Sequence, residues 1–565
     1  MPKLFFWLSK CSIVRPLHIA LRGSVRKTMF AVAIFSFFFS SVVLANDLSI
    51  TNAALVDQVT GDDTIDIQFD VTWENSWRDA TNYDAVWVFA KYCTENCTTN
   101  GTWLHATLSA TGTDAGSGTA LDVIVSADVK GAFLQRAGNG TGTVTTTGVH
   151  LVWDYGANGV SDADAVGANT RVKVFGMEMV YIPQGSFFAG DGSESLAQNP
   201  ASYAFKQGNT CRDPWPITSE DAITTSAQNP CTTPATYYYT ISTSPGDSAT
   251  GSVFTIGADF PKGYKAFYLM KYELSQGQYR DFLNSLPRGQ QNNHTQANVS
   301  GDSIPNTFVM GNTTTPFFRN FIRAPASGNG TTNPVVFGCD ANVNGVFDES
   351  TDGEWVAANL LNWMDHCAYA DWAALRPMTE LEFEKASRGA GITPVNLEYP
   401  WGSTSAPSHS SLTNADGATE VTDTASANAN YSSCWPAGPR RCGMFATGSS
   451  TRAQAGASYY GVMELAGNVG EQIVTVGNNT GRSFTGTHGD GALSSAGYGN
   501  NTDWPGYVTS EISSNIGQGF RGGAWAQGVG SMRVSSRDQA AYYSGYTVRV
   551  PTYHYFGSRS VRTAD

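Results

Sequence analysis

The chain has little positive charge. Its 565 residues hold 34 Lys and Arg against 48 Asp and Glu, which gives a formal net charge of -14. A surface of this sign repels phosphate backbones and anionic membranes at long range. No run of basic residues offsets the excess, so the sequence predicts no nucleic-acid partner.

A second long hydrophobic run is also missing. The only such run covers residues 29–45, after a basic stretch at 22–27, and it ends in Val43-Leu44-Ala45. This order of features indicates a signal peptide, residues 1–45, cleaved after Ala45. We therefore expect an exported protein (periplasmic, cell-surface or secreted) with no integral membrane segment after cleavage. An N-terminal membrane anchor is the alternative, and translation from Met29 would shorten the leader.

Cysteines are few for this length. There are nine, and Cys11 lies in the leader. The remaining eight form an even set, which in an exported chain indicates disulfides. Metal binding is the alternative, but no Cys-x2-Cys spacing supports it. Pairing close neighbours gives three expected disulfides: Cys93–Cys97, Cys211–Cys231 and Cys434–Cys442.

Residues 46–172 show short apolar and polar alternation. The stretches 64–73, 85–90, 121–125 and 148–154 follow this pattern and are separated by Gly, Asn, Asp and Thr. Period-two alternation between turn residues predicts an immunoglobulin-like β-sandwich. No constellation of catalytic residues occurs here, so a spacer or docking role is expected.

Residues 173–565 are expected to form a second domain. A Ser-, Thr-, Pro- and Asn-rich stretch at 191–263 reads as an insertion held by a disulfide. Amphipathic patterns predict helices at 275–286 and 357–373, and a capped start at Thr379 predicts a third. The rest is Gly-rich and dominated by loops, so the whole chain is expected to be an α+β protein with few helices.

This region contains six motifs, at 180–187, 272–275, 375–389, 399–402, 461–471 and 520–525, the last being Phe-Arg-Gly-Gly-Ala-Trp. Their order resembles that of the formylglycine-generating enzyme family, also called sulfatase-modifying factors. Six ordered matches are far more specific than one. The resemblance implies a C-type-lectin-like fold with much irregular structure.

The residues that oxidases of this family need are absent. In the family, a cysteine pair after the Gly-Gly-Ser-Trp motif holds copper, because two thiolates suit Cu(I). The resemblance places these positions at Gln527 and Met532, and places the active-site serine at Ala524. Related iron enzymes use three histidines, yet no His-x3-His spacing occurs here. No copper or iron is therefore expected, and the sequence favours a protein without catalysis.

The resemblance also implies a structural calcium site. The family wraps Ca2+ with two side chains and two backbone carbonyls, which here correspond to Glu464, Gly467, Val469 and Glu471. Oxygen ligands suit this ion. A longer Glu464 replaces the usual Asp or Asn. The alternative is that both glutamates face solvent on a turn.

The terminal loops, residues 520–565, are rich in Tyr, Ser and Gly, as adaptable binding surfaces are. They resemble the variable region of retroelement-diversified C-type lectin proteins, which are surface receptors. The positions expected to contact a ligand are Trp525, Ala526, Gln527, Val529, Ser531, Asp538, Tyr542, Tyr543, Tyr546, Tyr553 and His554. The alternative is that these tyrosines pack a loop-rich domain.

These observations favour a secreted or surface protein that binds a protein or glycan ligand through its terminal loops. Two alternatives remain open. One is a modifying enzyme of the family, such as a formylglycine-generating oxidase. The other is a structural component of a cell-envelope assembly.

Overall fold

A computed structural model gives the fold. It describes residues 47–191, 205–207, 213–226, 237–239, 246–247, 253–302, 304–328, 330–543 and 554–565. The expected signal peptide, the expected Cys211–Cys231 disulfide, much of the segment 191–263, and Tyr546 and Tyr553 lie outside the described residues.

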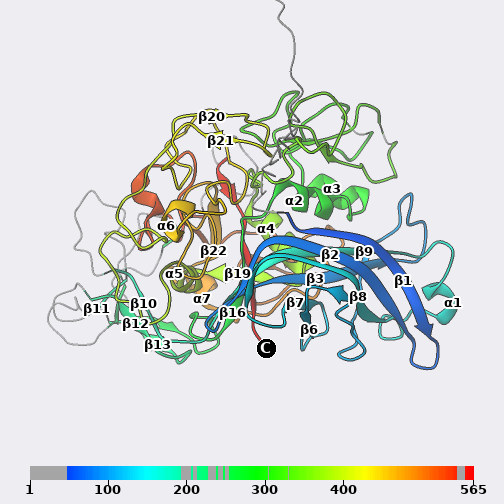
Figure 1. Ribbon diagram of the computed structural model, residues 1–565, viewed down its shortest axis with the longest axis horizontal. Helices are drawn as coiled ribbons and strands as arrows, with labels where there is room; N and C mark the ends of the chain where they lie inside the picture. Colours follow the sequence, from blue (N-terminus) through cyan, green and yellow to red (C-terminus); the bar gives the residue numbers. More distant parts are fainter. Residues whose placement is uncertain are drawn as a thin grey trace, which may run out of the picture. The chain divides into compact units, whose positions relative to one another are not determined.

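The first sheet contains the longest strands. It has the order β1-β2-β8-β5, made by β1 (Ser49–Val59), β2 (Thr64–Arg78), β8 (Gly140–Asp154) and β5 (Ser117–Gly118). The three long strands run side by side in Figure 1. Along β2, buried and partly exposed residues alternate, because successive side chains point to opposite faces. This is the period-two pattern seen in the sequence.

A larger, 11-stranded sheet has the order β25-β22-β19-β27-β16-β9-β3-β7-β6, with β26 beside β22 and β4 beside β3. Its strands are β3 (Asp84–Cys93), β4 (Leu104–His105), β6 (Leu121–Val125), β7 (Ala132–Arg136), β9 (Arg171–Ile182), β16 (Phe267–Met270), β19 (Arg376–Thr379), β22 (Gly470–Val474), β25 (Gln518–Arg521), β26 (Phe556–Gly557) and β27 (Ser560–Thr563).

Strand β9 joins the two halves of the chain. It pairs with β3 on one side and with β16 on the other, and it spans the expected boundary between residues 172 and 173. Residues of β3 and β7 in the larger sheet share a buried core with β2 and β8 of the first sheet. All the described residues fall within one compact unit. The immunoglobulin-like β-sandwich stays a prediction.

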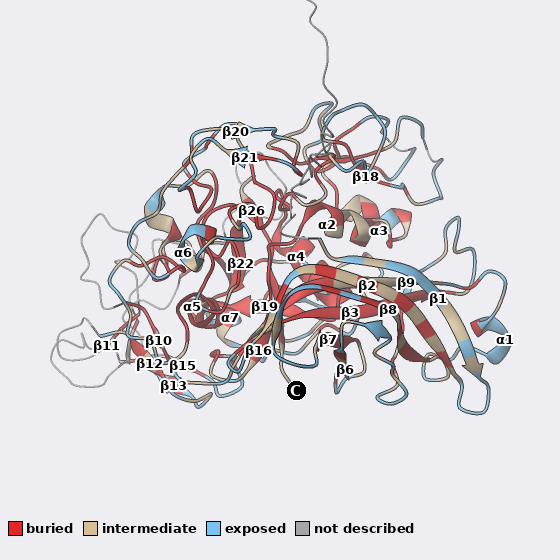
Figure 2. Ribbon diagram, viewed as in Figure 1, coloured by how far each residue is buried: buried red, intermediate tan, exposed pale blue. Residues whose placement is uncertain are grey.

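Strand β3 contributes to two cores at once. Val86 and Val88 pack with Ile67 and Phe69 of β2. Trp87, on the opposite face, packs in the core of the C-terminal region. Every residue of β3 is therefore buried, as the red strands in the centre of Figure 2 illustrate.

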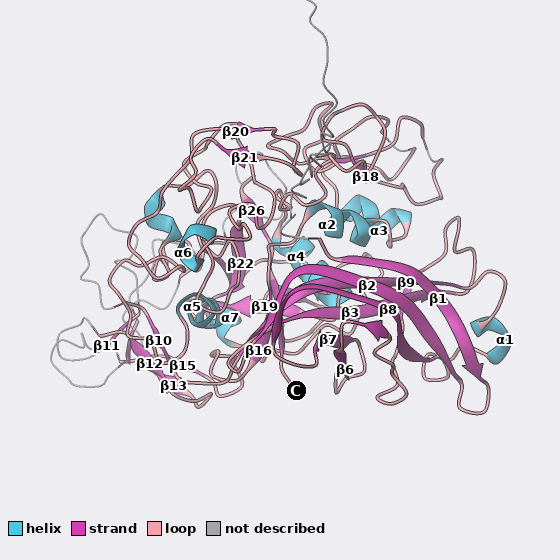
Figure 3. Cartoon of the chain, in the orientation of Figure 1, coloured by secondary structure: helices cyan, strands magenta, loops and turns pink. Residues whose placement is uncertain are grey.

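Helices are few and short, in agreement with the expected α+β class, and loops dominate the C-terminal region (Figure 3). The three longest helices begin at capping boxes of Ser275, Asn362 and Thr379. The described helices are α1 (Asp162–Ala165), α2 (Gln276–Leu283), α3 (Arg288–Asn293), α4 (Trp363–Trp372), α5 (Glu380–Arg388), α6 (Arg452–Ala455), α7 (Asn479–Arg482) and the 3-10 helix η3 (Val529–Met532). None of these described helices has the length and apolar character needed to cross a membrane.

The remaining described strands form short two-stranded sheets within the loop-rich region. The pairs are β10 (Phe187–Ala189) with β12 (Trp215–Ile217), β11 (Lys206–Gln207) with β14 (Tyr237–Tyr238), β13 (Ile223–Thr224) with β15 (Thr255–Ile256), β17 (Ile322–Arg323) with β18 (Gly338–Cys339), β20 (Leu412–Thr413) with β21 (Val421–Thr422), and β23 (Tyr507–Val508) with β24 (Glu511–Ile512).

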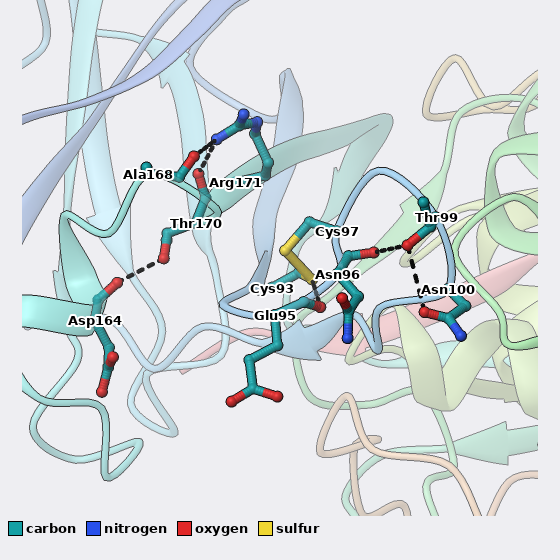
Figure 4. Close-up of a disulfide and its surroundings, with 10 residues drawn as sticks. All are labelled: Cys93, Glu95, Asn96, Cys97, Thr99, Asn100, Asp164, Ala168, Thr170 and Arg171. Atoms are coloured by element: carbon teal, nitrogen blue, oxygen red, sulfur yellow. Dashed lines mark hydrogen bonds between the residues drawn. A yellow bond between two sulfur atoms is a disulfide. The ribbon is translucent and has the colours of Figure 1, made fainter.

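One expected disulfide is confirmed and one is wrong. Cys93 and Cys97 are bonded, as Figure 4 shows. Cys434 and Cys442 are free thiols. The Cys442 thiol contacts the Glu273 carbonyl oxygen, whereas the Cys434 thiol contacts that of Tyr431. The guanidinium of Arg440 donates to the carbonyls of residues 434, 436 and 438, so the intervening chain wraps around Arg440 instead of closing on a disulfide.

Helix α5 carries a buried ladder of charges. Arg521 donates to Glu380 (3.1 Å) and to Glu384 (2.6 Å), and Arg537 donates to Glu380 (2.8 Å). Arg388 completes the ladder by bonding Glu384. Burial opposes the negative charge of Glu380, but Arg537 and Arg521 hold its pKa below the ordinary value. This ladder, defined as Glu380, Glu384, Arg388, Arg521 and Arg537, ties α5 to the start of the terminal loops.

We expect Glu380→Gln to lower the free energy of unfolding by about 3 kcal/mol, because it leaves two buried guanidiniums short of one negative charge. Urea unfolding measures this, with the exposed Glu95→Gln as the control. Folding lowers the pKa of Glu380, so the wild type's extra free energy of unfolding over Glu380→Gln is complete above the pKa of an unfolded glutamate, about 4.3. This difference in stability should shrink as the pH falls through the folded-state pKa of Glu380. Equal stability of the two variants would contradict the assigned role.

Candidate functional site

The terminal loops begin at a turn of two glycines. Strand β25 ends at Arg521, and Gly522 and Gly523 follow with φ of 83° and 69°. A Cβ at Gly522 would lie 2.2 Å from Oε2 of Glu471. Glycine is required here by the left-handed backbone and by this close approach.

The turn directs Trp525 inward. Its side chain is 2% exposed, and its ring lies 5.2 Å from that of Phe318 and 5.0 Å from that of His554. Its backbone N–H donates to the carbonyl of Asn468. The indole N–H is buried and has no hydrogen-bond partner among the described residues. Trp525 is therefore a buried support for the terminal loops, and it packs against His554, which is partly exposed.

The positions that correspond to the family's copper ligands hold other contacts. The side-chain amide of Gln527 donates to Oε1 of Gln539 at 2.7 Å. Met532 is fully buried and packs with Tyr399, Trp401 and Tyr431. Ala524, at the serine position, is also fully buried. The Gln527 amide is bound within the loop and the Met532 thioether is packed in a core. Neither side chain is placed as a soft ligand for a metal ion.

The other expected contact residues gather around η3 and the chain after it. The Ser531 hydroxyl donates to the Asp538 carboxylate at 3.2 Å, and Val529 is 38% exposed. Ala526, Gln527, Ser531, Asp538, Tyr542, Tyr543 and His554 are all partly exposed. These side chains are thus partly accessible at the protein surface, whereas Trp525 is buried.

Trp435 is a surface residue that the sequence reasoning missed. It is 73% exposed. Two residues before it, the N–H of Ser433 donates to the carbonyl of Trp525 at 2.6 Å, and the N–H of Ser432 donates to that of Gln527 at 2.9 Å. A tryptophan within a polar loop, Ser-Ser-Cys-Trp-Pro, was the signal available in the sequence. We define the rim as Trp435, Gln527, Val529, Ser531 and His554.

The expected calcium ligands lie below this rim. Glu464 and Glu471 are 6% and 0% exposed, so the alternative that they face solvent is wrong. Glu464 accepts the N–H of Gly443 at 2.7 Å, while Arg559 reaches Oε1 of Glu471 at 3.5 Å. The second oxygen of each carboxylate is buried and has no hydrogen-bond partner in the described structure.

A third buried carboxylate, Glu273, belongs to the same cluster. It accepts the side-chain amide of Asn468 and the N–H of Val469, the latter at 2.9 Å. Burial raises the pKa of Glu464 to about 7 and that of Glu471 to about 8, and it raises the pKa of Glu273 well above the ordinary value. Three carboxylates thus lie near two guanidiniums, Arg559 and Arg441. Two free carboxylate oxygens in a site short of positive charge fit a divalent cation with a preference for oxygen ligands.

Comparison with known families gives one match. The model of the sulfatase-modifying factor enzyme 1-like domain matches residues 226–547, which is more than half of the chain. The match includes the α5 ladder, the terminal loops up to Tyr543 and the expected calcium segment. No curated protein matches the chain.

The packing role of Met532 can be tested by two substitutions. We expect Met532→Leu to cost less than about 1.5 kcal/mol, because it conserves volume, and Met532→Ala to cost about 2–5 kcal/mol through the cavity that it leaves. Urea unfolding of both variants measures the difference. If leucine destabilised the protein as much as alanine, the sulfur atom itself would matter and the packing role would be refuted.

Proposed function

Because the chain belongs to the sulfatase-modifying factor enzyme 1-like family, we propose that it is an exported member that binds a protein or glycan ligand at its rim and does not oxidise cysteine. The observation that carries this proposal is the pair of contacts at Gln527 and Met532. One side chain is bound to Gln539 and the other is buried in a core.

Chemistry supports this choice over the family's oxidase activity. Cu(I) is held by soft sulfur ligands, and two thiolates at close range provide them. An amide offers a hard oxygen instead, and one thioether is a weak ligand. The free cysteines among the described residues, Cys339, Cys367, Cys434 and Cys442, are all buried, and none occupies the family's copper positions.

The rim has the composition of a ligand-binding surface. Exposed Trp435 offers a large apolar area, and tryptophan is among the residues that carry most binding energy at interfaces. Small polar residues beside it, such as Ser531, adapt to a partner through hydrogen bonds. Below them, buried Trp525 packs with Phe318 and His554 and supports this surface. Tyr542, Tyr543, Tyr546 and Tyr553 would extend this surface in a retroelement-diversified receptor.

Calcium has a structural role in this proposal. Glu464 and Glu471 would bind it together with the carbonyls of Gly467 and Val469, and the ion would supply the positive charge that this cluster lacks. The same segment supports the terminal loops, because the N–H of Gly467 donates to Gly522 and the carbonyl of Asn468 accepts from Trp525. A bound cation would therefore stiffen the base of the rim.

Binding can be tested by screening the purified exported protein against a glycan array and a library of surface-protein peptides. We expect Trp435→Ala to weaken a detected interaction by about 2 kcal/mol or more, as loss of an interface anchor does. Tyr459→Ala, an exposed aromatic on another segment, is the matched control. A parallel assay supplies copper and a cysteine peptide of the sulfatase type. Formylglycine product from the wild type would refute the proposal.

Calcium should raise the thermal midpoint of unfolding. A dissociation constant a hundredfold below the free calcium concentration would add about 2.7 kcal/mol of stability. Differential scanning calorimetry with calcium or with EDTA measures the shift. Glu471→Gln should abolish the shift, because it removes one of the expected ligands, whereas the exposed control Glu95→Gln should retain it. A shift unchanged in Glu471→Gln would place calcium elsewhere.

A further inference from the structure

A cavity of about 470 Å³ opens between the first strand and helix α2. None of its lining residues belongs to the rim or to the calcium segment. Its walls come from β1, β9, α2, α4 and the loop 348–355. The residues used below are Phe175, Arg280, Glu354, Trp355 and Trp372.

Gly176 lets this cavity form. It lies in β9 at the point where β1 crosses, and a Cβ there would lie 2.7 Å from Cδ1 of Ile50 and 3.2 Å from Cδ2 of Leu48. Without a side chain at Gly176, both apolar residues can seat against β9 and close one wall. The volume is within the range of small-molecule sites, about 300–1,000 Å³.

The charges in the cavity do not balance. Arg280 is bound by Asp281 at 2.8 Å and also by Asp348. Glu354 is partly buried; its own backbone N–H donates to its carboxylate, and Arg280 acts on that carboxylate through space. Three carboxylates therefore line the space with one guanidinium, which is already paired twice. Glu354 is the carboxylate left for a ligand.

Aromatic rings form much of the remaining wall. Phe175 and Trp372 contact each other with ring centroids 4.8 Å apart, and Trp355 lies beside Glu354 in the sequence. The indole N–H of Trp372 is buried, and no described residue accepts a hydrogen bond from it. Aromatic faces attract cations, and tryptophan does so most strongly.

We propose that this cavity binds a small organic cation, a quaternary ammonium group on a short apolar body, with Glu354 as its counter-ion. The carboxylate supplies the charge and the rings supply the apolar and cation–π contacts. A bare metal ion would leave the aromatic walls without a partner. The site is separate from the proposed function at the rim.

Isothermal titration calorimetry with choline tests the proposal, with EDTA present so that the calcium segment does not contribute. We expect choline to bind, and its neutral isostere 3,3-dimethyl-1-butanol to bind at least about tenfold more weakly, because it lacks the charge that the aromatic faces and Glu354 attract. This comparison uses the wild-type protein and so does not depend on how a variant folds.

Glu354→Gln should weaken choline binding by about tenfold, which corresponds to about 1.4 kcal/mol. Glu95→Gln, an exposed carboxylate outside the cavity, should leave it unchanged. No choline binding at about 10 mM, a level at which even millimolar affinity saturates a site, would overturn the proposal. Equal binding of the isostere, or unchanged binding in Glu354→Gln, would also overturn it. Loss of ligand capture at the rim would leave these results unaffected.

Discussion

The buried ladder on helix α5 is the interaction on which the C-terminal region depends. Glu380 and Glu384 lie one turn apart and receive Arg521 from the end of β25 and Arg537 from the loop beyond it. Buried charges are tolerated only when they are paired and hydrogen-bonded. The ladder therefore fixes the loop of residues 522–536 at both ends, through Arg521 and Arg537. This loop carries Gln527, Val529 and Ser531 of the rim. The irregular chain between those points needs little secondary structure of its own.

Sequence reasoning succeeded where the information is local. Alternation along residues 64–73 marked strand β2, and the Thr379 capping box marked the start of α5. Six ordered motifs identified the family. Two of them hold parts of the buried ladder, because residues 375–389 contain α5 and residues 520–525 contain Arg521. The absence of cysteine at Gln527 and Met532 could also be read directly. These inferences need only residue type and spacing.

The parts that the sequence could not show depend on distant partners. Glu273 joins Glu464 and Glu471 from almost two hundred residues away, and no local pattern announces that contact. Cys434 and Cys442 look like a pair by spacing, but both thiols are free, and Arg440 binds the backbone carbonyls of residues 434, 436 and 438. The alternation in residues 46–172 predicted a sandwich, yet not that β3 would pack on both faces and share its sheet with the second half of the chain.

The place of β27 has a consequence for how the molecule assembles. This strand, Ser560–Thr563, lies between β16 and β19 and so in the interior of the larger sheet. Neighbouring strands cannot complete their hydrogen bonds until these residues arrive, and contacts so distant in sequence form slowly because loop closure costs entropy. Closure of the sheet is thus among the last steps of folding. Until β27 docks, β16 and β19 lack the backbone hydrogen bonds that this strand provides.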